Sequence, residues 1–144
     1  MKKLTTLLIL ILSFTLVSCG DLAQQDAPSP GDAARNYFDA LYNKKDMPLA
    51  VSMATPSLAR IMKSYGSAKQ FTRNLVNLQY DNVVIEIDMS NLSVRQQYED
   101  KAKVNLIFIG YLNSKKIDDM RSVEMIREDG IWYVDKIVPD PYAR

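Results

Sequence analysis

The sequence predicts an α+β domain in which N-terminal helices pack on an antiparallel sheet of about four strands. Apolar residues recur at three- and four-residue spacing between Asp32 and Leu78, and they follow a two-residue period after Tyr80. The dipeptide Asp129-Gly130 separates the last two segments that have this two-residue period. A helical period followed by a strand period indicates helices packed on one sheet, and 144 residues suffice for one core but not for two ordinary domains.

The most regular helical segment begins at Asp32, which we expect to cap its N-terminus. Its apolar side chains share one helical face. They are Ala34, Tyr37, Phe38, Leu41 and Tyr42. This segment is expected to supply the main helical surface that covers the sheet.

Three shorter helices are expected after it. Asp46 and Thr55 each precede a proline in the first helical turn, where the missing proline N–H costs nothing. Gly66 is expected to close the helix after Thr55 in the left-handed conformation, and Ser67 to cap a further helix over residues 67–78.

Four segments have the two-residue period of strands. They are residues 80–90, 101–112, 119–128 and 131–138. Asp129-Gly130 between the last two favours a tight type I′ hairpin, because both residues accept positive φ. The sheet is therefore expected to end in a hairpin.

The segment 101–112 is apolar on both faces, unlike its neighbours. One set of side chains comprises Val104, Leu106, Phe108 and Leu112, and the other comprises Ile107, Ile109 and Tyr111. If helices cover one face only, the second set forms an exposed apolar patch of the kind that marks interaction surfaces. The alternative is that the linker or the C-terminal tail shields these residues.

The amino terminus has the layout of a secretory signal. Lys2 and Lys3 precede an apolar run over residues 4–17, and polar residues follow at once. Crossing a bilayer takes about 20 apolar residues, so the run is too short for a retained membrane helix. We therefore expect export.

Cys19 is the single cysteine, and it stands at the end of this run. An intrachain disulfide lacks a second cysteine, and the absence of histidine removes both a Cys/His metal set and a histidine base for a catalytic thiol. Attachment of lipid is the function that remains for this residue.

The stretch Leu16, Val17, Ser18 and Cys19 resembles the lipobox of bacterial lipoproteins. The resemblance implies cleavage after residue 18 and acylation of Cys19 with diacylglycerol and a fatty acyl chain such as palmitate. Two or three chains are needed for stable membrane binding. Gly20 after the cysteine, in the sorting pattern of enteric bacteria, implies an outer-membrane location facing the periplasm.

The resulting organisation is a cleaved signal peptide (1–18), a lipidated polar tether (19–31), the α+β domain (32–139) and a tail (140–144). Cleavage removes two of the 18 basic residues and none of the 17 acidic ones, which leaves a formal charge of −1. A nearly neutral, exported chain is not expected to bind nucleic acid.

Beyond these features, the order of elements resembles the nuclear transport factor 2-like superfamily, a cystatin-like roll in which a curved sheet wraps a long helix into a cone. The matching stretches are "SPGDAARNYFDALYNKKDMPLAVSMATPSLARIM" and "DGIWYVDKI". Small bacterial lipoproteins occur in this superfamily. The resemblance implies a fold much more than an activity, because one fold hosts many functions.

Two functions from different classes follow. The first is a non-enzymatic binding or scaffolding module, anchored through Cys19, that contacts a second copy or another envelope protein through Ile107, Ile109 and Tyr111. The second is a binder of small apolar ligands, or an enzyme, with a cone lined by Tyr37, Tyr65 and Trp132. The competing interpretation of these aromatic residues is that they fill the core. We expect no cofactor, no metal ion and no catalytic residue set.

Overall fold

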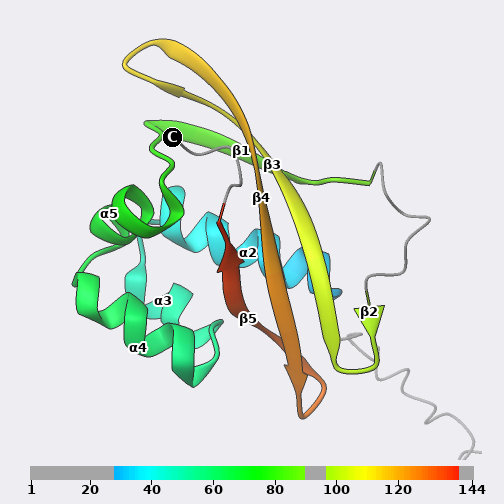
Figure 1. Ribbon diagram of the computed structural model, residues 1–144. Helices are drawn as coiled ribbons and strands as arrows, with labels where there is room; N and C mark the ends of the chain where they lie inside the picture. The colour runs from blue at the N-terminus through cyan, green and yellow to red at the C-terminus, as the bar shows by residue number, and fades with distance from the viewer. Residues whose placement is uncertain (1–27, 90–96, 140–144) are drawn as a thin grey trace, which may run out of the picture.

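The computed structural model describes residues 28–89 and 97–139 of the chain (Figure 1). In these ranges the helical elements are α2 (Pro30–Tyr42), α3 (Met47–Ser52), α4 (Pro56–Tyr65), α5 (Ala68–Phe71) and the π-helical turn η1 (Thr72–Val76). The strands are β1 (Asn82–Ile87), β2 (Gln97–Tyr98), β3 (Lys101–Leu112), β4 (Lys115–Glu128) and β5 (Ile131–Val138). Helices followed by an antiparallel sheet confirm the α+β prediction.

The sheet has the order β1-β3-β4-β5, and β2 pairs with the beginning of β3. All of these pairs are antiparallel. Asp129 and Gly130 join β4 to β5 with φ values of 50° and 82°, so both residues have the positive φ that the predicted hairpin requires. Asn113 and Ser114 form a second two-residue turn, with φ of 50° and 66°, between β3 and β4. That turn makes β3 and β4 one long central hairpin.

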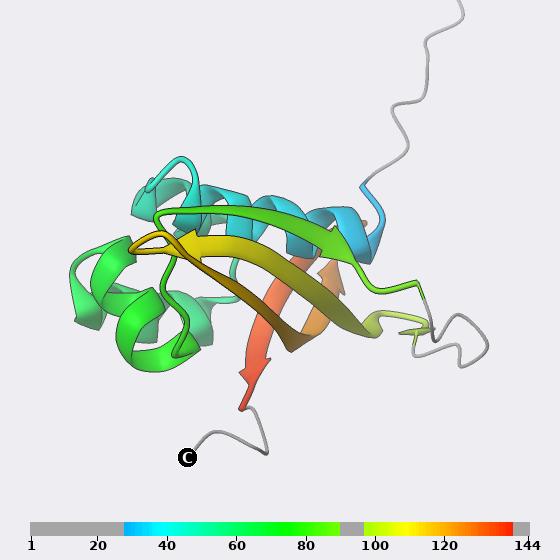
Figure 2. The same cartoon turned by 90° about the horizontal axis from the view of Figure 1, so that it is seen from above.

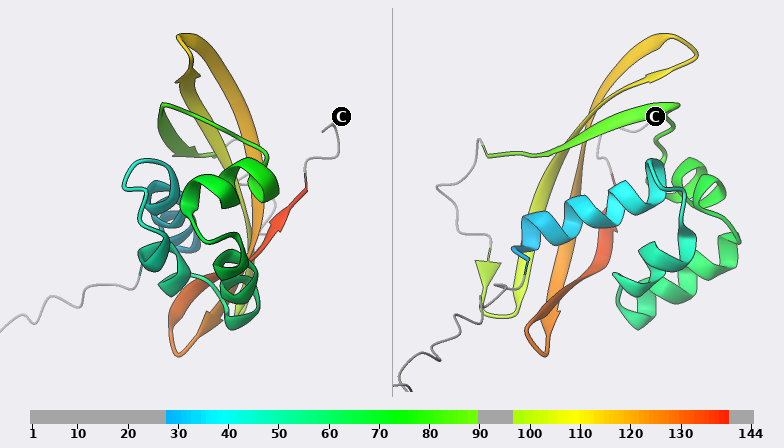
Figure 3. Two further views of the ribbon diagram at one scale, coloured as in Figure 1. Left: turned by 90° about the vertical axis from the view of Figure 1, so that its left-hand side faces the viewer. Right: turned by 180° about the vertical axis from the view of Figure 1, so that it is seen from behind.

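The helical elements all lie on one face of the twisted sheet (Figures 2 and 3). Helix α2 runs along this inner face and contacts β1, β3, β4 and β5. The shorter helices gather near the C-terminal end of α2 (Figure 1). Within the described residues no helix covers the opposite, outer face.

Helix α2 begins earlier than its apolar pattern predicts. Its N-cap is Ser29 rather than Asp32, and Pro30 occupies the first helical position. The Asp32 backbone N–H donates to Ser29 Oγ (3.1 Å), and the Ser29 hydroxyl donates to the Asp32 carboxylate (2.7 Å). The predicted cap is therefore wrong by three positions, because Asp32 acts as the acidic residue of the first turn.

The other predicted caps are confirmed. Asp46 accepts the Leu49 N–H, and Thr55 and Ser67 cap α4 and α5 through their hydroxyl oxygens. Gly66 ends α4 in the left-handed conformation, with φ of 76°. These local contacts fix where each short helix starts and stops.

The core lies between α2 and the inner face of the sheet. The ring of Phe38 on α2 meets Phe108 on β3 edge to face, with 5.1 Å between centroids. Tyr42, one turn further along α2, contacts the same phenylalanine at 5.8 Å. Both phenylalanines are fully buried. Each aromatic pair of this kind stabilises a fold by about 0.5–1.5 kcal/mol beyond the area that it buries.

Strand β5 is tied to the helical layer at Val134. The Val134 N–H donates to the Met53 carbonyl, and the Thr55 N–H donates to the Val134 carbonyl, each at 2.9 Å. The Thr55 hydroxyl also donates to Asp135 (2.9 Å). These bonds satisfy part of an edge that would otherwise present unpaired backbone groups.

Gly110 on β3 is a position where no side chain fits. A Cβ atom there would lie 2.4 Å from the Asn82 carbonyl oxygen and 2.6 Å from Cδ1 of Tyr80. We predict that Gly110→Ala lowers the free energy of unfolding by about 1–3 kcal/mol, because backbone of β1 must move. Urea unfolding followed by circular dichroism measures the change.

Gly31→Ala is the control for this prediction, because a Cβ there meets only the flexible end of Ile87. It is expected to change the free energy of unfolding by less than about 1 kcal/mol. Equal effects of the two substitutions would contradict the steric argument.

Candidate functional site

The predicted lipid-attachment site lies outside the described residues. This holds for Leu16, Val17, Ser18 and Cys19. Within residues 28–89 and 97–139, no helix has the length and apolar character that a membrane span requires. Anchoring through Cys19 therefore stays a prediction from the sequence.

None of the three hollows described below is lined by Tyr37, Tyr65 or Trp132, the aromatic residues expected around a cone. Tyr37 and Trp132 are buried in the core. The Tyr37 hydroxyl donates to the Met62 sulfur (3.4 Å), and burial raises the pKa of Tyr37 far above its ordinary value, with the nearby Tyr42 adding to the shift. Tyr65 is half-buried and packs edge to face on Phe71, with 5.7 Å between centroids. These contacts match core packing.

The predicted interaction residues do share one surface. Ile107, Ile109 and Tyr111 point to the outer face, where Tyr111 is 47% exposed and the two isoleucines are half-buried. Strand pairing brings Val84 opposite Ile109 and Met120 opposite Ile107. Val84 is 59% exposed and Met120 is 47% exposed. We call the five residues Val84, Ile107, Ile109, Tyr111 and Met120 the outer patch.

Charged residues flank the outer patch along the strands. At one end Lys103 pairs in register with Glu124. At the other end Lys116 lies opposite Tyr111, and its ion-pair partner Asp118 (3.0 Å) lies opposite Ile109. Exposed Glu86 lies opposite Ile107, so acidic side chains also border the middle of the patch. An apolar centre with a charged rim is the composition of a protein-binding surface.

Sequence reasoning missed a buried cation on the inner face. Arg121 is only 4% exposed, in register with Leu106 of β3. Its guanidinium donates to the Val76 carbonyl (3.1 Å) and to the Asp119 carboxylate (2.7 Å). The alternation of β4 could have revealed it, since Arg121 has the same parity as the buried Val123. A cation at this position stabilises the C-terminal end of η1.

Two tyrosine hydroxyls lie near this cation and differ in their partners. The Tyr42 hydroxyl donates to the Leu78 carbonyl (3.1 Å), whereas the buried Tyr80 hydroxyl has no hydrogen-bond partner among the described residues. Burial, with a smaller contribution from the Asp119 carboxylate, raises the pKa of Tyr80 to about 12. Burial also raises the pKa of Tyr42 well above its ordinary value.

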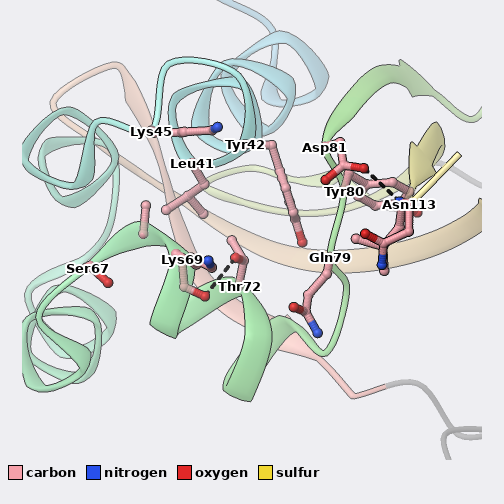
Figure 4. Close-up of a pocket in the computed structure, with 12 residues that line it drawn as sticks. Leu41, Tyr42, Lys45, Ser67, Lys69, Thr72, Gln79, Tyr80, Asp81 and Asn113 are labelled. Atoms are coloured by element: carbon pink, nitrogen blue, oxygen red, sulfur yellow. Dashed lines mark hydrogen bonds between the residues drawn. The ribbon is translucent and has the colours of Figure 1, made fainter.

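A hollow of about 710 Å³ opens at the C-terminal end of α2 (Figure 4). Its lining comes from the end of α2, from α5, from the residues before β1 and from the turn between β3 and β4. In Figure 4, Lys45 and Lys69 lie toward the helices, while Asp81 and Asn113 lie toward the strands. We call this cavity the α2-end hollow. Its volume is typical of small-molecule sites.

The described residues contain no group of three or more His, Cys, Asp or Glu side chains arranged to hold a metal ion. Comparisons of the chain with protein-family models, with curated proteins and with solved structures gave no match. The two candidate surfaces are therefore characterised by their own geometry and chemistry.

Tyr42 and Tyr80 allow a matched test of how a hydrogen-bond partner for a buried hydroxyl affects stability. We predict that Tyr80→Phe raises the free energy of unfolding by roughly 1 kcal/mol at pH 7, because a buried hydroxyl without a partner is destabilising. Tyr42→Phe should lower it by about 1–3 kcal/mol, because the Leu78 carbonyl loses its donor. Urea unfolding of both variants measures the two changes, and equal signs would contradict the assignment.

The same variants carry a pH signature. The pKa of Tyr80 is about 12 in the folded chain against 10.0 for the unperturbed group, so the unfolded chain releases this proton first. The contribution of Tyr80 to native-state stability is therefore unchanged below pH 10 and becomes increasingly unfavourable as the pH rises from 10 toward 12. The advantage of Tyr80→Phe over wild type is expected to widen across this interval, as urea midpoints at several pH values would show.

Proposed function

We propose that the protein is a lipid-anchored lipoprotein of the bacterial cell envelope and acts as a non-enzymatic binding module. The observation that carries the binding role is the outer patch, a contiguous apolar surface on a sheet face that no described helix covers. Val84 and Met120 are exposed to water in the single chain, and they would be buried if another protein surface packed against the outer patch. The domain would serve to present this face.

The occupant that we propose for the outer patch is a second copy of the chain. A two-fold axis that lies in the interface and crosses the strands between Ile107 and Ile109 places the Lys116 end of one copy against the Glu124 end of the other, so these opposite charges face each other. Self-complementary charge around an apolar centre is what a two-fold interface requires.

The anchoring role is supported by the sequence alone. Lys2 and Lys3, the apolar run and the stretch Leu16–Cys19 occur together in the order of a lipoprotein leader. Helix α2 begins at Pro30, so the polar residues between Cys19 and this helix are available as a tether. We place the domain at the outer membrane, facing the periplasm.

We further propose that the domain belongs to the nuclear transport factor 2-like superfamily. In support, α2, the longest of the described helices, lies along one face of an antiparallel sheet, and four short helical elements separate it from β1. The described sheet remains open, with β1 and β5 at its edges.

The anchoring proposal predicts the behaviour of Cys19→Ala. In a Gram-negative host, the wild-type chain should lose residues 1–18, gain acyl mass and enter the outer-membrane fraction. The variant should lack the acyl mass and leave that fraction, because it has no thiol to acylate. Intact mass spectrometry with membrane fractionation measures both. An unacylated wild-type chain would contradict the proposal.

The outer patch predicts a charge-sensitive self-association. In the chain from Gly20 onward, which retains every described residue, Met120→Glu should weaken self-association at least about tenfold, because each dimer then buries two unpaired carboxylates. Ile61→Glu is the matched control, since Ile61 is 44% exposed but lies on α4, on the helical side. Analytical ultracentrifugation measures the dissociation constants.

A photo-crosslinker at position 111 tests the same face in cells. Crosslinked dimers of the chain are the expected product. A wild-type chain that stays monomeric at all concentrations and yields no crosslinked dimer would exclude self-pairing. Crosslinks to a different envelope protein would support the binding role of the outer patch but would show that its partner is not a second copy of the chain.

A further inference from the structure

We propose that the α2-end hollow binds a single-chain amphiphile with an anionic head, a hydrocarbon chain that ends in a carboxylate or a phosphate. The inference is independent of the outer patch, because no residue of that patch lines the hollow. It rests on three features of the lining: an apolar floor, two cations without recorded partners, and a single acidic side chain that is already engaged.

The floor of the hollow is apolar and buried. Leu41, Tyr42, Ala68 and Thr72 line it with little or no exposure, and half-buried Leu112 and Tyr80 extend it toward the sheet. The Tyr42 and Thr72 hydroxyls already donate to the carbonyls of Leu78 and Lys69. Aliphatic carbon can therefore cover the part of the floor formed by Leu41, Tyr42 and Thr72 without leaving those hydroxyls unpaired, whereas the Tyr80 hydroxyl has no partner among the described residues.

Two ammonium groups stand at the rim of the hollow. Neither Lys45 nor Lys69 has an ion pair among the described residues. By contrast, Lys44, the neighbour of Lys45, pairs with Asp39 at 3.3 Å. Lysines that are left unpaired beside an apolar cavity are suited to an anionic head group.

The acidic side chain of the lining does not neutralise these cations. Asp81 accepts the backbone N–H of Asn113 (2.7 Å), and its own N–H donates to the Tyr111 carbonyl (2.7 Å). It is thereby fixed on the strand side, across the hollow from the lysines in Figure 4. The lining retains a net positive charge, with the head group expected at the lysine side.

The other described hollows lack this combination. A hollow of about 410 Å³ beside β5 includes Arg121, whose guanidinium is bonded to backbone carbonyls and to Asp119, and a single lysine, Lys136, without an ion pair among the described residues. A hollow of about 300 Å³ beside β1 includes Arg35, which pairs with Asp32 at 2.8 Å. Among the three, the α2-end hollow alone has two lysines without an ion pair among the described residues.

Lys45 also occupies a conformation that disfavours its own residue type. Its φ is 55°, in the left-handed region that glycine adopts readily and that is unfavourable for a residue with a Cβ atom. Lys45→Gly therefore removes the rim cation while relieving backbone strain, so lost binding cannot be attributed to unfolding. Asp129, with φ of 50° in the hairpin between β4 and β5, provides the matched substitution far from the hollow.

The experiment uses the chain from Gly20 onward, titrated by isothermal calorimetry below the critical micelle concentrations of the probes. Decanoate and decyl phosphate carry the two anionic heads, decanol is the neutral probe, and decyltrimethylammonium is the cationic probe. Both anions, or one of them, should bind at least about tenfold more tightly than the cation and the alcohol. The preference between the two anions identifies the head group, and affinity should fall as salt is raised.

The double variant Lys45→Gly, Lys69→Ala should lose about tenfold in affinity for the preferred anion while remaining folded. Asp129→Gly should bind as wild type does. Gln79→Trp, which places a large side chain at the rim, should block binding of the anion. Circular dichroism of each variant confirms the fold.

Three results would overturn the proposal. They are no binding of either anion, equal binding of anion, alcohol and cation, or full affinity in the double variant. Inorganic phosphate alone is expected to bind far more weakly than decyl phosphate, and equal affinities would also overturn it, because the apolar floor would then contribute nothing.

Discussion

The packing of aromatic rings around Phe108 is the contact on which the rest of the fold depends. Phe108 lies at the middle of β3, the strand paired with both β1 and β4. Phe38 and Tyr42 from α2 meet its ring from the helical side, and Tyr80 stacks on it with 6.3 Å between centroids. One buried side chain therefore joins the helix, the segment before β1 and the centre of the sheet. Burying such a ring stabilises a fold by about 1.5–3 kcal/mol before the aromatic pairs are added.

The local features of this fold were predictable because the residues that cause them are adjacent in the sequence. Asp46, Thr55 and Ser67 cap their helices through bonds to the third residue onward, and the hairpin at Asp129 needs only two residues that tolerate positive φ. The prediction placed the start of α2 three residues too late, because aspartate is favoured both at the N-cap and in the first turn of a helix. Pro30 was the better guide, since proline prefers the first helical position.

The candidate surfaces were predictable only in part, because they depend on register and topology. Alternation within β3 placed Ile107, Ile109 and Tyr111 on one face correctly. Met120 joins them only through its pairing with Ile107, which the sequence of either strand does not specify. Tyr37 and Trp132 show the opposite difficulty, because an aromatic residue on an apolar stripe can equally fill a core or line a cavity. Lys45, Lys69 and Asp81 are brought to one hollow by elements that are separate in the sequence.

Helix α2 also acts as a spacer of fixed length within the domain. The preceding chain enters at its Ser29 cap, whereas Leu41 and Tyr42 at its other end line the hollow. Thirteen residues of helix separate the two ends by about 20 Å. In the lipid-anchored form proposed above, insertions or deletions before Ser29 would therefore change the reach of the domain without altering the geometry of the hollow. Reach and binding geometry are thus free to evolve independently.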